Sequence, residues 1–88
     1  MRIADGFLTR KVGADTVIIA IGERAKTFQG MVKMNETAKD IWNWVKEGLT
    51  EEEIAKRLAQ EYDVDPETAA KDTAAILDEM EKQGFLER

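Results

Sequence analysis

One stretch of the chain decides its fold: residues 30–42, which read GMVKMNETAKDIW. An alternating run with the character of a strand stops at Asn35, and a helix with an apolar period of about 3.6 residues begins on the same residue. Asparagine is among the best helix N-caps, because its side-chain oxygen accepts a backbone N–H that the first turn leaves unpaired. This junction therefore divides the chain into a strand-forming part and a helical part.

Three strand-like segments precede the junction. Phe7–Val12 alternates in polarity, and Thr16–Ile21 carries three consecutive β-branched aliphatic residues, which favour a pleated and buried strand. A polar loop is expected over residues 22–27. The third strand is predicted to span Phe28–Met34, with a bulge or a close backbone approach at Gly30.

Helical signals fill the rest of the chain. The first helix is predicted from Asn35 to about Glu47, the second from the capping box of Thr50 and Glu53 to about Tyr62, and the third from Asp65 to about Gln83. The fold class predicted is α+β, a small sheet that packs against a helical bundle. On the first helix Trp42 falls within the apolar stripe and is expected in the core. Trp44 falls outside that stripe and is interpreted as a boundary residue or as part of a contact surface.

Composition limits the chemistry of this chain. Its 88 residues, 43% of them hydrophobic, suit a single domain spanning residues 1–88. The chain has neither cysteine nor histidine, which removes disulfides, thiol nucleophiles and Cys/His zinc sites. It also has no apolar run of membrane-spanning length and no signal-peptide pattern. We therefore expect a soluble cytoplasmic protein that contacts no membrane.

The residues that could suggest catalysis have a structural explanation. Glu51–Glu53 resembles an acidic cluster, but a capping box accounts for it. Asp63 and Asp65 lack the rest of a calcium-loop pattern. No nucleophile is paired with a base. The prediction is a binding module that is not an enzyme and that uses no metal and no cofactor.

Charge separates the two parts of the chain. Residues 1–34 carry six basic and three acidic residues, whereas residues 35–88 carry seven basic and fifteen acidic residues. The third helix, residues 66–83, holds two basic and five acidic residues, which would repel a phosphate backbone. A winged-helix DNA-binding regulator is thus an alternative that the charges disfavour, and we expect no nucleic-acid partner. The basic strand part could instead attract an acidic peptide.

A series of short motifs, in this order and spacing, resembles the PqqD family, the pyrroloquinoline-quinone biosynthesis protein D group. These motifs are MNETA at 34–38, IW at 41–42, EGLTEEEI at 47–54, EYDV at 61–64 and GFL at 84–86. The resemblance implies a winged-helix-like fold with three short N-terminal antiparallel strands and three helices. It also implies a peptide chaperone, the recognition element that captures the leader of a ribosomally made precursor peptide. Such an element presents the leader to a modifying enzyme, often a radical SAM protein.

In that family the leader adds as an antiparallel strand to the third strand, in a groove that the third helix completes. An exposed strand edge offers unpaired N–H and C=O groups to such a peptide. The peptide-binding residues predicted on this basis are Gly30, Met31, Val32, Lys33, Met34, Ala69, Asp72, Thr73 and Ile76. Core packing of the third-helix residues remains an alternative. A further alternative is an assembly subunit of a biosynthetic enzyme that dimerises through the same edge. The precursor peptide and the product of the pathway stay open.

Overall fold

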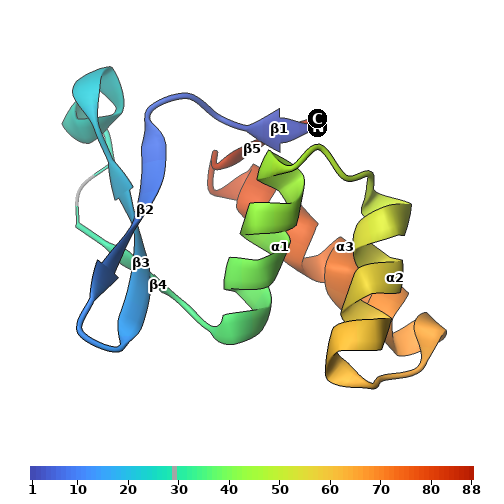
Figure 1. The fold of residues 1–88 in the computed structure, drawn as a ribbon. Coiled ribbons are helices and arrows are strands. Elements are labelled where there is room, and N and C mark those ends of the chain that lie inside the picture. The colour runs from blue at the N-terminus through green and yellow to red at the C-terminus, as the bar shows by residue number, and fades with distance from the viewer. Residues whose placement is uncertain (29) are drawn as a thin grey trace.

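The computed structural model describes residues 1–28 and 30–88. The elements follow the chain as β1 (Arg2–Ile3), β2 (Phe7–Val12), β3 (Asp15–Ala20), the 3₁₀ helix η1 (Gly22–Lys26), β4 (Val32–Met34), α1 (Glu36–Lys46), α2 (Glu51–Tyr62), α3 (Pro66–Lys82) and β5 (Leu86–Glu87). Figure 1 shows the larger sheet standing to one side of the helices, with both chain ends beside β1. The predicted α+β class, three antiparallel strands followed by three helices, is confirmed.

The larger sheet is antiparallel, with strand order β2-β3-β4. A two-residue loop joins β2 to β3, and Gly13 occupies its first position with φ of 64°. Glycine suits that position because a type II′ turn needs a positive φ there. The tight turn fixes the register of β3, and β4 then pairs with the other side of β3.

The third strand is shorter than predicted. β4 begins at Val32, not at Phe28, and Gln29 lies outside the described residues. Two local features explain the late start. The N–H of Phe28 donates to the Arg24 carbonyl at 2.9 Å, which keeps this residue with η1. Gly30 then takes a φ of 91°, which a strand does not use. The segment predicted as a polar loop forms η1 instead.

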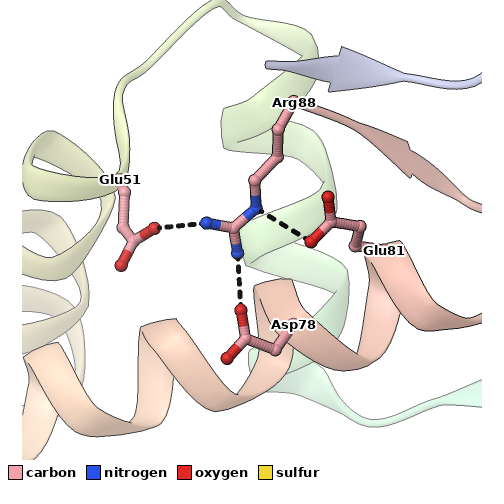
Figure 2. A network of polar contacts seen from close by, with 4 residues as sticks. All are labelled: Glu51, Asp78, Glu81 and Arg88. Carbon is pink, nitrogen blue, oxygen red and sulfur yellow. Dashed lines mark hydrogen bonds and ion pairs between the residues drawn. The ribbon is translucent and has the colours of Figure 1, made fainter.

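A second, two-stranded sheet was not predicted. β1 pairs with β5 in antiparallel register, so the two ends of the chain meet. Arg88, just past β5, reaches carboxylates on two helices (Figure 2): Glu51 at 3.1 Å, Asp78 at 2.8 Å and Glu81 at 3.5 Å. These contacts connect the end of the chain to α2 and α3.

The core lies among the three helices, and its aromatic part joins them to the larger sheet. Aromatic rings gather there edge to face, with centroids 5.0 Å apart for Phe7 and Phe85 and 5.9 Å apart for Trp42 and Phe85. Trp44 is only 7% exposed, and the Arg57 guanidinium of α2 lies 5.8 Å from its ring centroid. Trp44 is therefore a core residue, and its interpretation as a boundary residue or as part of a contact surface is wrong. α2 packs against the side of α1 that carries Trp44, which lies outside the apolar stripe.

Candidate functional site

The candidate site is the open edge of β4. β3 pairs with one side of β4, and within residues 1–28 and 30–88 no strand pairs with the other side. An exposed strand edge carries N–H and C=O groups that another extended chain can pair with. The edge therefore has the main-chain groups that strand addition requires.

The hydrogen-bonding direction of β4 follows from the hairpin before it. The two-residue loop places Val12 opposite Asp15, and the turn bonds these two residues to each other. In an antiparallel ladder, hydrogen-bonded pairs alternate with non-bonded pairs. The main-chain polar groups of Asp15 thus face β2, and those of Thr16 face away from β2, toward β4.

This alternation identifies the residue of β4 whose main-chain N–H and C=O face the open edge. Thr16 is in register with Met34, and Ile18 is in register with Val32, so these two pairs carry the bonds between β3 and β4. Lys33 lies between them. Its N–H and C=O therefore point away from β3, to the open edge, while its side chain lies on the opposite face from those of Val32 and Met34.

An apolar groove runs beside this edge. It is a hollow of about 270 Å³ bounded by β4, α1 and α3. Val32 and Met34 form one wall, and Ile76 and Met80 of α3 form the other. Trp42, which is only 1% exposed, contributes to the lining from α1. Apolar side chains of an added strand would find matching surface here.

The predicted site residues divide between the groove and other places. Val32, Lys33, Met34 and Ile76 line the groove. Gly30 and Met31 precede β4, and the Met31 side chain is 63% exposed. Asp72 is exposed on α3 but does not line the groove, whereas Ala69 and Thr73 have no exposed surface.

The two buried residues lie in the core, which agrees with the core-packing alternative for them. Ala69 belongs to the hydrophobic core cluster. The Thr73 hydroxyl has no hydrogen-bond partner in the described part of the chain. Neither side chain is accessible to a peptide in this arrangement.

Sequence reasoning missed the C-terminal half of α3. Glu79, Met80 and Gln83 line the groove, as does Phe85 just beyond the helix. On a helix, a step of three or four residues from Ile76 reaches Glu79, Met80 and then Gln83. The periodicity could have found these residues, but it does not reveal which half of the helix lies beside β4.

Ionisable groups around the groove are exposed. Lys33 forms an ion pair with Asp15 at 3.5 Å, and the two side chains are 70% and 50% exposed. Such pairs contribute little to stability. Among the described residues no group of three or more His, Cys, Asp or Glu side chains could hold a metal ion. The groove offers shape, apolar surface and main-chain pairing, which are the requirements for binding an extended chain.

Comparison with known proteins places the chain in a family. The family model described as Coenzyme PQQ synthesis protein D (PqqD) matches residues 15–86. The chain belongs to the PqqD family. The match begins at the first residue of β3 and includes β4 and all three helices, so every wall of the groove lies within the PqqD region. The resemblance on the short motifs is thereby confirmed.

A solved structure shares the PqqD fold seen here. It is described as TbiB1 in complex with the TbiA(beta) leader peptide, and it aligns with a TM-score of 0.82 and 24% sequence identity. The alignment covers 99% of this chain and 95% of that chain. A search of curated proteins found no match. In the described residues of this PqqD-family chain, no helix is both long enough and apolar enough to cross a bilayer.

Proposed function

We propose that this PqqD-family protein binds the leader segment of a ribosomally made precursor peptide as an antiparallel strand on β4. The observation that carries this proposal is the open edge of β4 beside an apolar groove walled by α3. Main-chain pairing would supply affinity, and the groove would select side chains at alternate positions. The fold shared with TbiB1, which was solved in complex with a leader peptide, supports a leader peptide as the ligand.

The residues that would carry binding are Val32, Lys33 and Met34 on β4 and Ile76, Met80 and Gln83 along α3. Gly30, Met31 and Asp72 would flank the bound peptide. Ala69 and Thr73 leave the proposed contact set because they are buried. Residues 1–88 act in this proposal as one recognition domain, which binds and presents the peptide and does no chemistry itself.

The partner in this proposal is a peptide-modifying enzyme, and a radical SAM protein is the class that we favour from the family. The encounter would take place in the cytoplasm, where ribosomes release the precursor. If this is correct, the gene should lie beside a gene for a short peptide and one for such an enzyme. A neighbourhood that holds only DNA-processing genes would argue against the proposal.

A charge substitution in the groove tests the site directly. Random 12-residue peptides are selected by mRNA display on the full chain, and the affinity of the best binder is measured by fluorescence anisotropy. Ile76→Asp should weaken binding at least tenfold, because an apolar anchor contributes about 1.5–3 kcal/mol on burial and the new charge would face it. Ala75→Asp places the same charge on the exposed face of α3 and should leave affinity unchanged.

Amide chemical-shift mapping gives an independent measurement. On adding the selected peptide, shifts should concentrate at residues 31–35 and in the C-terminal half of α3. Shifts confined to α2, or unchanged affinity in Ile76→Asp, would mean that peptides dock elsewhere.

A further inference from the structure

The strand-addition mode fixes which ligand side chains face the groove. Side chains alternate between the two faces of a sheet, and directly paired residues of neighbouring strands point to the same face. A ligand residue opposite Lys33 would therefore point to the outer face, away from the groove. The residues before and after it would lie on the face of Val32 and Met34, and both of these residues line the groove.

The outer face next to this position carries two basic side chains, Arg10 and Lys33, and Asp15 on the same face forms an exposed ion pair with Lys33 at 3.5 Å. Arg10, Val17 and Lys33 are in register across β2, β3 and β4, so they form one row. The Lys33 side chain ends this row at the open edge, and it is 70% exposed. A ligand residue that extends the row would stand directly beside Lys33, where an opposite charge is favourable.

The face of the added strand that turns toward the groove disfavours acidic residues. Glu79 of α3 lines the groove, and the other lining residues on β4 and α3 near it are mainly apolar. An acidic side chain turned inward would meet Glu79 and lose hydration. Acidic residues are thus favoured opposite Lys33 and disfavoured on either side of it.

The same geometry disfavours a second copy of this chain at the edge. Two β4 strands paired antiparallel about Lys33 would place the two lysines directly opposite each other. Like charges at directly paired positions destabilise a sheet. A strand from another peptide with a carboxylate opposite Lys33 replaces this repulsion with attraction.

Building on the proposed function, we infer that the ligand is a peptide whose bound strand reads apolar–acidic–apolar. The two apolar side chains enter the groove between β4 and α3. The acidic residue between them pairs with Lys33 on the outer face. The position of the charge, not the net charge of the peptide, determines recognition.

The experiment reads the preferred residue at each position. A display library of 12-residue peptides is selected in parallel on the full chain, on Lys33→Glu and on Lys56→Glu. Lys56 is exposed on α2, outside the groove, so Lys56→Glu controls for the change in net charge. The best binders are then resynthesised with Glu, Gln or Lys at the central position, and their affinities are measured at low and high salt.

The unsubstituted chain and Lys56→Glu should both enrich Asp or Glu between two apolar residues. The Glu peptide should bind about two- to fivefold more tightly than the Gln peptide, the range of an exposed cross-strand ion pair. Lys33→Glu should reverse the preference toward Lys or Arg. High salt should reduce the difference, because exposed charges are screened.

Two kinds of failure can be told apart. Enriched peptides that alternate in polarity but show no acidic preference, or no reversal in Lys33→Glu, would overturn this inference and leave strand addition intact. A library that yields no binder, or binders insensitive to Ile76→Asp, would overturn the proposed function itself.

Discussion

Thr73 is a buried polar residue whose hydroxyl is unsatisfied. Its side chain has no exposed surface, and its Oγ1 finds no partner in the described structure. A buried polar group without a hydrogen bond destabilises the folded state by about 1–3 kcal/mol. Valine has nearly the same shape and a similar helix propensity, so it can occupy the site without this penalty.

Thr73→Val should therefore raise the free energy of unfolding by about 1 kcal/mol. Urea denaturation monitored by tryptophan fluorescence measures the change, and the slope with denaturant should stay the same. Peptide affinity should also stay the same, because Thr73 does not line the groove. A loss of affinity at unchanged stability would return Thr73 to the binding site.

At the scale of the elements, the backbone N–H groups of Val32 and Lys33 on β4 point in opposite directions, so proline should have different effects at the two positions. Proline has no N–H to donate. Lys33→Pro removes the N–H that faces the open edge, so the fold should persist while peptide binding is lost. Val32→Pro removes a bond between β3 and β4, so stability itself should fall. Circular dichroism melting and anisotropy separate the two effects. A folded Lys33→Pro that binds peptide normally would contradict the assigned direction of the edge.

Two carboxylates in helix caps make the stability of the folded protein depend on pH. The pKa of Asp65 is lowered mainly by the backbone N–H of Thr68, and the pKa of Glu53 is lowered mainly by the backbone N–H of Thr50. When folding lowers the pKa of a carboxyl group, its ionised form stabilises the folded state at any pH above the pKa it has in the unfolded chain. This stabilisation is lost as the pH falls through the pKa of the group in the folded state. Stability should thus decline as pH falls below the ordinary values of 4.5 for Glu53 and 3.8 for Asp65.

Replacing both carboxyls with amides should flatten this decline. Asn is as good an N-cap as Asp, and Gln serves in a capping box as Glu does, so stability at pH 7 should change little in Glu53→Gln with Asp65→Asn. Thermal melting from pH 7 to pH 3 measures the difference. Glu61→Gln, outside both caps, is the control. A double variant as acid-sensitive as the parent chain would show that other groups dominate.

At the scale of the whole molecule, the first and last residues of the sequence bond to each other. The N–H of Ala4 donates to the Phe85 carbonyl at 2.8 Å, and Arg2 pairs with Glu87 at 2.7 Å. Phe85 lies in the aromatic cluster and also lines the groove. The pairing of β1 with β5 therefore helps to hold Phe85, a groove residue, in place, although β1 lies outside the family match.

Arg88→Ala should lower the free energy of unfolding by about 1 kcal/mol, because three carboxylates lose a shared cation while remaining partly exposed. The effect should shrink in high salt. Lys71→Ala removes a single exposed pair with Glu67 and should change stability less. Urea denaturation at two salt concentrations measures both. Equal effects of the two substitutions would mean that the Arg88 contacts do not act as a network.

The helix boundaries and their caps could be predicted from the sequence alone. The side chains of Asn35, Thr50 and Asp65 each accept a backbone N–H three residues later, as predicted. These bonds lie within one turn, so a few neighbouring residues determine them. The order of strands before helices also follows from patterns within short segments of the sequence. The ordered short motifs, read together, were enough to recognise the PqqD family.

Only the tertiary structure decided where the groove lies. Apolar residues recur along α3 from Ala69 to Met80, and packing places the C-terminal half of the helix beside β4 while burying Ala69 and Thr73. The pairing of β1 with β5 and the burial of Trp44 also depend on segments distant in sequence. Local bonds fix where each element begins and ends, but a site between elements depends on which faces long-range packing leaves uncovered.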